Sequence, residues 1–301
     1  MPQVTFEEIQ CKTALNRVNV PAMTHLRWSL NPYRGCQHAC VYCFARGNHE
    51  YLGYNTGRDF DQRIVVKVNL VEVLRRELRR PSWQREPVTI GTACDPYQQA
   101  ELKYGLTRGA LQAFRDHASP CSLITKSPNV VRDLELLRDL SGVAECTVLF
   151  SVATLREDVW RHIEPETAKP RHRLEALARL AGAGVRCGVM LAPIIPGLTD
   201  DAENLEAVVS AAREHGAAFV GDNVLYLKPG TKEWFMPFLR ETFPHLLPQY
   251  ERFYRGAYAP KSYSEEVGAA VEQLRERWGM TPRQVAARAP REPVGQLKLA
   301  M

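Results

Sequence analysis

The most informative stretch of this sequence runs Asn31-Pro-Tyr-Arg-Gly-Cys-Gln-His-Ala-Cys-Val-Tyr-Cys-Phe-Ala-Arg46. It contains three of the eight cysteines of the chain, Cys36, Cys40 and Cys43, in the spacing Cys-x3-Cys-x2-Cys. Three thiolates on one short loop can bind three irons of an iron–sulfur cluster, because soft sulfur ligands suit iron. No second cysteine pair follows nearby, so one iron would keep an open position, as a catalytic metal site requires.

Two other interpretations of the stretch remain open. His38 could complete a Cys3His zinc site, although zinc motifs usually take two ligands from a second knuckle. The cysteines could also be plain structural thiols that lie close together by chance. The spacing is specific enough that the open iron–sulfur interpretation is preferred.

The stretch resembles the signature of the radical S-adenosylmethionine (SAM) superfamily, with Tyr42 before the last cysteine. Two further segments, Gly91-Thr-Ala-Cys-Asp-Pro-Tyr-Gln98 and Ala192-Pro-Ile-Ile-Pro-Gly197, make the chain similar to a narrower group. That group is the spore photoproduct lyase-like radical SAM proteins, often labelled DNA repair photolyases. The resemblance runs from Leu26 to Tyr258, most of the chain.

The resemblance implies a partial (β/α)6 barrel and a [4Fe–4S] cluster held by Cys36, Cys40 and Cys43. SAM would bind the open iron, and one electron would split it into methionine and a 5′-deoxyadenosyl radical that abstracts a substrate hydrogen. The cofactors carry this chemistry, while the protein binds, orients and excludes water. The implied partners are an electron donor such as flavodoxin or ferredoxin and an unknown substrate, with a DNA photoproduct as one option. The competing class is a non-catalytic iron–sulfur or zinc protein that binds nucleic acid.

The resemblance also implies residues that contact SAM. Tyr42 would pack on the adenine, and the backbone near Phe44 would hydrogen-bond it; alternatively both aromatic rings fill the core. Thr92 and Asp95 stand where many relatives have a Gly-Gly-Glu-like element that holds the SAM amino group, although this sequence departs from that element. A carboxylate can accept from an ammonium group, but Asp95 could equally cap a turn before Pro96.

Three more residues complete the expected SAM site. Ser151 would bind the ribose or the carboxylate, and Arg173 would pair with the carboxylate. The segment from Pro193 to Gly197 would supply backbone and apolar surface to the adenine. The alternatives are a turn-forming serine, a solvated helix-surface arginine and a purely structural turn.

Cys94 is the candidate for a catalytic thiol. Spore photoproduct lyases use a cysteine near this strand end to return a hydrogen atom to the product radical, and that cysteine aligns nearer Thr92. Cys94 would face the same side of an extended strand, so we expect it within the active-site cavity. The alternative is a buried, inert thiol.

The chain has 301 residues, of which 45% are hydrophobic and 24% charged, as in an ordinary globular protein. The net charge of +5 favours anionic partners mildly. We therefore expect at most weak, salt-sensitive nucleic-acid binding, with the arginines of the segment 75–80 forming a solvated face. The scattered remaining cysteines indicate reduced thiols, and no signal peptide or membrane span is visible, so a cytoplasmic enzyme is expected.

Short apolar runs alternate with helical patterns, which predicts an α/β fold with six strands buried in a parallel sheet. We expect an N-terminal extension over 1–25, the barrel core over 26–228, and a C-terminal helical cap with a basic tail over 229–301. The segment 47–61 is expected to be irregular. The predicted strands are 27–30, 88–90, 122–125, 146–152, 185–195 and 217–227. The predicted helices are 70–80, 106–117, 129–140, 171–183, 200–215, 234–240, 246–258 and 265–278.

The cysteine assignment predicts that Cys40→Ala abolishes cluster assembly, because the remaining two thiolates cannot hold the cluster. Iron and acid-labile sulfide content after anaerobic reconstitution measures this. Normal iron loading of the Cys40→Ala protein would exclude Cys40 as a ligand. Cys121→Ala, at a cysteine outside the motif, is the matched control and should load normally.

Overall fold

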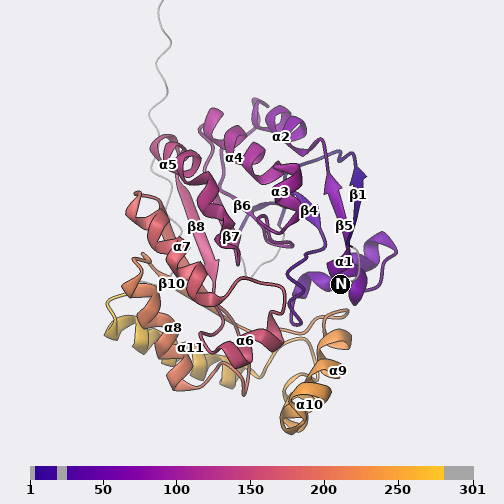
Figure 1. Ribbon diagram of the computed structural model, residues 1–301, viewed down its shortest axis with the longest axis vertical. Coiled ribbons are helices and arrows are strands. Elements are labelled where there is room, and N and C mark those ends of the chain that lie inside the picture. Colours follow the sequence, from indigo (N-terminus) through magenta and orange to yellow (C-terminus); the bar gives the residue numbers. More distant parts are fainter. Residues whose placement is uncertain (1–3, 19–25, 281–301) are drawn as a thin grey trace, which may run out of the picture.

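The computed structural model describes residues 4–18 and 26–280. Its centre is a seven-stranded sheet with the order β10-β9-β8-β7-β6-β3-β2 (Figure 1). The short edge strand β2 runs antiparallel to β3, whereas the other neighbours are parallel. The strands are β2 (Asn16–Arg17), β3 (Trp28–Leu30), β6 (Val88–Ile90), β7 (Cys121–Thr125), β8 (Cys146–Ser151), β9 (Arg186–Ile194) and β10 (Val220–Val224).

The six parallel strands lie side by side in chain order, without a reversal. A doubly wound sheet reverses its order at a switch point, so this arrangement belongs to a partial barrel. Every residue of β8 is buried, as expected for a parallel strand covered on both faces. The predicted α/β fold with six parallel strands is therefore confirmed.

Helices connect these strands and surround them on the outside (Figure 1). In α4 the buried side chains Leu106, Ala110, Leu111 and Phe114 recur at helical spacing and cover the sheet. At the start of α8 the Asp201 carboxylate accepts from the Asn204 N–H at 2.9 Å, which caps the helix. The connecting helices are α2 (Leu70–Leu78), α3 (Ala100–Tyr104), α4 (Leu106–Asp116), the 3-10 helix η2 (Pro128–Asp133), α5 (Leu134–Val143), α6 (Glu157–Ile163), α7 (Pro170–Gly182) and α8 (Ala202–Glu214).

A second, three-stranded sheet joins the N-terminal segment to the cysteine loop. Its central strand β5 (Arg63–Lys67) pairs in parallel with β1 (Thr5–Ile9) and antiparallel with β4 (Tyr33–Arg34). The segment before β5 was expected to be irregular, and this expectation is wrong. It contains the 3-10 helix η1 (Phe44–Leu52) and α1 (Arg58–Gln62). Its Gly, Asn and Asp residues disfavour helix locally, but burial of Arg46, His49 and Phe60 overrides that preference.

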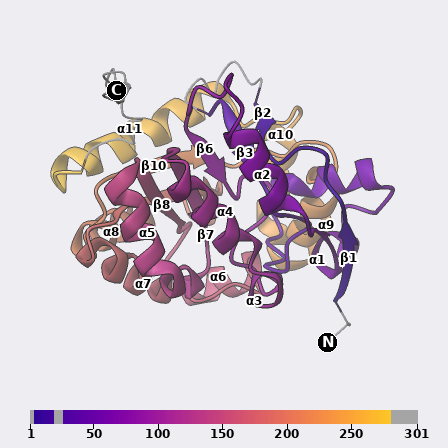
Figure 2. The ribbon, with the colours of Figure 1, turned by 90° about the horizontal axis from the view of Figure 1, so that it is seen from above.

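The C-terminal helices fall into two groups. Side chains of α9 (Lys232–Thr242), the 3-10 helix η3 (Pro244–Leu246) and α10 (Leu247–Phe253) pack in one hydrophobic cluster with Cys40, Val41 and Tyr42. The last helix, α11 (Lys261–Arg277), lies instead along α8 and β10 (Figure 2). The predicted helix over 246–258 is shorter than expected and ends at Phe253. The predicted basic tail falls largely in 281–301, outside the described residues.

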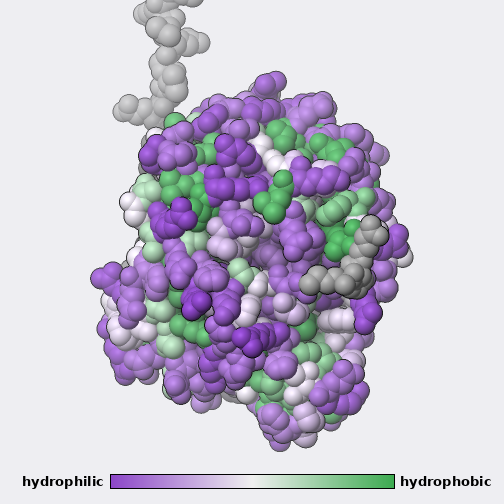
Figure 3. Space-filling view, viewed as in Figure 1, coloured by the Kyte–Doolittle hydropathy of each residue, from purple (hydrophilic) through white to green (hydrophobic). Residues whose placement is uncertain are grey.

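The face of the molecule seen in Figure 3 is mainly hydrophilic, with hydrophobic side chains in separate patches. None of the helices in the described ranges combines the length and hydrophobicity that a bilayer span requires.

The packing of β9 generates a stability prediction. A Cβ on Gly188 would lie 2.3 Å from the ring of Phe219, which is fully buried and cannot move aside. Gly188→Ala should therefore lower the free energy of unfolding by about 1–3 kcal/mol. Gly142→Ala, at an open position in α5, should instead raise it by about 0.5–1 kcal/mol. Denaturant unfolding of both variants checks this, and a Gly188→Ala protein as stable as the parent would contradict the close packing.

Candidate functional site

The three motif cysteines lie on the loop that follows β3, at the carboxyl end of that strand. Cys36 and Cys40 are buried, and Cys43 is partly buried. Gly35 has φ +80°, and a Cβ there would lie 2.7 Å from the carbonyl of Phe60, so only glycine fits. Ala39 also adopts the left-handed region, with φ 54°. A residue other than glycine is strained in this region, and the strain at Ala39 is tolerated because packing around the loop fixes its backbone.

Two glutamine side chains join the cysteine loop to the segment after β6. The Gln98 Oε1 accepts from the Gln37 N–H at 3.0 Å, and its Nε2 donates to the Gly35 carbonyl at 3.2 Å. Gln37 in turn accepts from the Ala100 N–H at 2.7 Å. Gln98 is fully buried. Its side chain therefore makes the hydrogen bonds to the loop backbone that a neighbouring strand would otherwise make. The cysteine loop and the segment that ends at Gln98, both of which carry the family resemblance, are thus in direct contact.

Arg46 holds the same loop from the other side. Its fully buried guanidinium donates to the carbonyls of Ala39 and Cys40, each at 3.2 Å. The ring centres of Phe60 and Trp234 lie 4.9 and 4.7 Å from its Cζ. Arg46 is therefore a buried residue that holds the loop in place.

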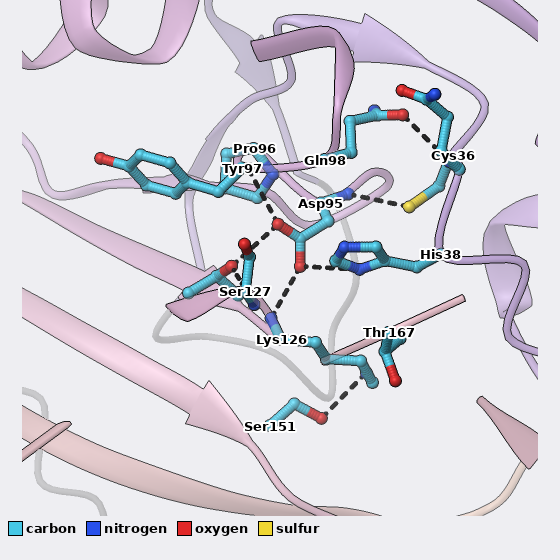
Figure 4. A network of polar contacts seen from close by, with 12 residues as sticks. Cys36, His38, Asp95, Pro96, Tyr97, Gln98, Lys126, Ser127, Ser151 and Thr167 are labelled. Carbon is cyan, nitrogen blue, oxygen red and sulfur yellow. Dashed lines mark hydrogen bonds and ion pairs between the residues drawn. The ribbon is translucent and has the colours of Figure 1, made fainter. Parts of the chain in front are cut away.

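Asp95 connects the cysteine loop to β7 (Figure 4). Its backbone N–H donates to the Cys36 sulfur at 3.4 Å, and His38 Nδ1 lies 3.3 Å from its carboxylate. The carboxylate also accepts from the N–H groups of Tyr97 and Lys126 and from the Thr125 hydroxyl. Burial alone would raise the pKa of Asp95, but His38 and the backbone donors lower it to about 2. The bond to Tyr97 is the turn cap expected as the alternative role.

Lys126 is a site residue that sequence reasoning missed. Its Nζ donates to the Ser151 hydroxyl at 3.0 Å (Figure 4), and Ser151 donates to the Ala192 carbonyl at 2.8 Å. Burial would lower the pKa of Lys126, but electrostatic interactions with Cys40 and Glu164 hold it above its ordinary value. The available signal was its position directly after a predicted strand, where α/β folds place functional groups.

A fully buried network lies beneath Tyr42. The Tyr42 hydroxyl donates to Glu164, and Arg173 forms an ion pair with the same carboxylate. Arg173 also donates to the carbonyls of Ser151 at 2.8 Å and Ala168 at 3.0 Å. Arg173 is therefore not the solvated surface arginine considered as the alternative. Its guanidinium already has several acceptors within the chain.

The remaining predicted residues lie around this centre. Thr92 accepts from the Asn31 side-chain amide at 3.1 Å, and the Cys94 sulfur lies 3.9 Å from the Asn31 Oδ1. Cys94 is 5% exposed, and its role as a hydrogen donor stays a prediction. Pro193 follows a cis peptide bond. Phe44 faces outward, 38% exposed.

The structure therefore divides the predicted residues among several places. One set is buried, a second lies at Asn31, and Phe44 lies at the surface, while Pro193 lies apart from them, partly buried near the end of β9. The buried set consists of Tyr42, Asp95, Ser151 and Arg173; the set at Asn31 consists of Thr92 and Cys94.

The donor set suits a multi-iron cluster better than a single metal ion. Within 4–18 and 26–280, no three His, Cys, Asp or Glu side chains are placed to hold one ion. A zinc site needs its ligands around one centre, and His38 faces Asp95. In an iron–sulfur cluster each cysteine binds a different iron, so the sulfurs need not converge. Burial raises the pKa of the Cys40 thiol to about 12, so cluster binding would have to displace its proton.

The chain belongs to the radical SAM superfamily, whose family model matches residues 30–212. It is 42% identical over 272 residues to an uncharacterized protein of Mycobacterium tuberculosis, covering 90% of this chain and 80% of that protein. It is 28% identical over 198 residues to an uncharacterized protein of Methanocaldococcus jannaschii, covering 66% of this chain and 71% of that protein.

Solved structures of spore photoproduct lyase share the fold. The lyase complexed with dinucleoside spore photoproduct has a TM-score of 0.69 and 16% sequence identity, covering 91% of this chain and 79% of that chain. The expected radical SAM fold is thereby confirmed. A sequence identity of 16% gives no information about the substrate of this chain.

The buried ion pair generates a second stability prediction. Arg173→Met would leave the Glu164 carboxylate in the interior without its main partner, and should lower the free energy of unfolding by about 3–5 kcal/mol. Adding Glu164→Gln should restore part of this loss. Arg161→Met breaks an exposed pair with Glu157, which solvent screens, and should leave the free energy of unfolding nearly unchanged. Denaturant unfolding measures all three; equal effects of Arg173→Met and Arg161→Met would contradict the buried pair.

Proposed function

We propose that this chain is a radical SAM enzyme in which Cys36, Cys40 and Cys43 hold one [4Fe–4S] cluster. The observation that carries the proposal is the buried cysteine loop, whose backbone is held by hydrogen bonds from Gln98 and Arg46. A loop fixed in this way can present three thiolates in one arrangement. Superfamily membership supports the same conclusion.

Lys126 and Ser151 are the proposed contacts for the SAM carboxylate. Lys126 carries a positive charge beside Cys40 and Cys43, and its Nζ has the small Ser151 hydroxyl as its side-chain partner. A carboxylate placed there would gain a charge-assisted hydrogen bond. Ser151 keeps the carboxylate-binding role predicted from the sequence.

Asp95 and Arg173 are proposed to position other groups instead of binding SAM directly. The Asp95 carboxylate is surrounded by His38, Thr125 and the N–H groups of Lys126 and Tyr97. Arg173 fixes Glu164, and through it the Tyr42 hydroxyl. Tyr42 then presents its ring to the SAM adenine, as predicted, with Pro193 and the backbone near Phe44 as further contacts.

When bound, the cluster and SAM supply a 5′-deoxyadenosyl radical. The chain contributes burial: Cys36, Cys40, Tyr42 and Asp95 are each under 9% exposed. Exclusion of water protects reactive species from side reactions. Thr92 and Cys94 stay candidates for contact with SAM and with the product radical respectively.

For the substrate we propose a chemical class and not a single molecule. The lyase with the same fold binds dinucleoside spore photoproduct, so a pyrimidine lesion in DNA is one candidate for this chain, with Cys94 as the hydrogen donor. Radical chemistry on a peptide, an RNA base or a small metabolite is the alternative. A low-potential electron carrier such as flavodoxin or ferredoxin would supply the electron.

The test is anaerobic reconstitution followed by assay with SAM. The expected result is a visible absorbance band near about 400 nm that dithionite bleaches, with formation of 5′-deoxyadenosine and methionine. A protein that binds zinc tightly and never cleaves SAM would overturn the proposal in favour of the nucleic-acid-binding class.

The Lys126 assignment predicts that Lys126→Met weakens SAM binding about 10- to 100-fold, the loss expected for a hydrogen bond to a charged group. Calorimetric titration of the cluster-loaded protein measures this, with iron content checked in parallel. Lys103→Met, which removes an exposed lysine on α3, is the matched control and should bind SAM normally. Unchanged affinity in a fully loaded Lys126→Met protein would exclude the carboxylate contact.

A further inference from the structure

The cysteine loop comes closest to solvent at Cys43. Cys36 and Cys40 are each 7% exposed, whereas Cys43 is only partly buried and the next residue, Phe44, is 38% exposed. On this side the Thr231 hydroxyl donates to the Cys43 carbonyl at 3.1 Å. The segment after β10 therefore forms the outer wall of the loop here.

Three aromatic rings, called here the aromatic row, lead outward from this point: Phe44, Tyr226 and Tyr258. The ring centres of Phe44 and Tyr226 are 5.5 Å apart, and those of Tyr226 and Tyr258 are 5.9 Å apart and stacked. Tyr226 also forms a β-bridge with Tyr258, which fixes the pair. Because Phe44 directly follows Cys43 in the chain, the inner end of the row lies beside the cysteine loop.

The outer end of the row is exposed and flanked by cations. Tyr258 is 65% exposed, and Phe44 is 38% exposed. Exposed aromatic rings that lie together usually mark an interaction site. The exposed Lys228 ammonium lies 5.5 Å from the centre of the Tyr226 ring. Arg255 is exposed in the turn that precedes Tyr258. The patch thus combines an apolar centre with positive charge.

We propose that the aromatic row, with Lys228 and Arg255, is the docking surface for an acidic one-electron carrier protein. This inference rests on the proposed function, which consumes one electron for each SAM cleaved. The carrier loses one electron, [4Fe–4S]2+ gains it to become [4Fe–4S]+, and no bond forms between the proteins.

Two features favour a carrier over a substrate at this surface. Ser151 is buried and its partner Lys126 is half-buried, whereas Tyr258 at the outer end of the row is exposed. A carrier must also arrive, transfer and leave, and such encounters use small contact areas steered by opposite charges. A few rings flanked by two cations, above the most exposed cysteine of the loop, meet these requirements.

The experiment compares two reductants on cluster-loaded protein. Flavodoxin hydroquinone is the protein donor and dithionite the small one, and stopped-flow absorbance follows cluster reduction. Tyr258→Ala and Lys228→Glu should each slow reduction by flavodoxin about tenfold at low salt, and the Lys228→Glu deficit should shrink as salt rises. Dithionite should reduce Tyr258→Ala at the parent rate. Calorimetry with oxidised flavodoxin should show the same loss as weaker binding.

Two controls keep the result specific. Tyr258→Phe retains the ring and should behave as the parent, and Tyr51→Ala removes an 87% exposed ring elsewhere on η1 and should change neither rate. Equal slowing with both reductants, or unchanged flavodoxin rates in Tyr258→Ala and Lys228→Glu, would overturn the docking surface. Normal flavodoxin rates with impaired SAM cleavage would assign the row to the substrate instead. Failure of the proposed function is distinct, because the parent protein would then bind no cluster.

Discussion

The structure depends on burying a short loop that has almost no regular hydrogen bonding of its own. Its polar backbone groups would destabilise the interior if they were left without partners. Arg46 satisfies two of its carbonyls, and Gln98 satisfies a carbonyl and an N–H. The Val41 N–H donates to the Ile163 carbonyl at 3.1 Å. The cysteine loop is therefore held by hydrogen bonds from several elements of the chain.

The parallel sheet explains why those elements meet at the loop. Because the six strands run in chain order, their carboxyl ends lie along one edge, and the segments that follow them approach one another. Asp95 follows β6, Lys126 follows β7, and Ser151 ends β8. The polar groups of the site are consecutive in space because the strands are consecutive in the sheet.

Charge alternates within this site. The carboxylates of Asp95 and Glu164 each face a cationic or donor partner, His38 in one case and Arg173 in the other. Lys126 is half-buried, with the Ser151 hydroxyl as its side-chain partner. We propose it as the contact for an anion, because the other charged groups of the site are already paired.

The sequence alone determined the cysteine motif, the order of the six parallel strands, and the superfamily, because each is written in local spacing and periodicity. It also identified Asp95 and Ser151 at strand ends. It did not determine the helices η1 and α1 before β5. It did not identify Lys126 or the roles of Arg46 and Arg173, since a lone cation in a sequence carries no sign of burial. Only the tertiary structure decided these, because pairing partners such as Glu164 with Arg173, or Phe60 and Trp234 with Arg46, meet through packing between segments far apart in the chain.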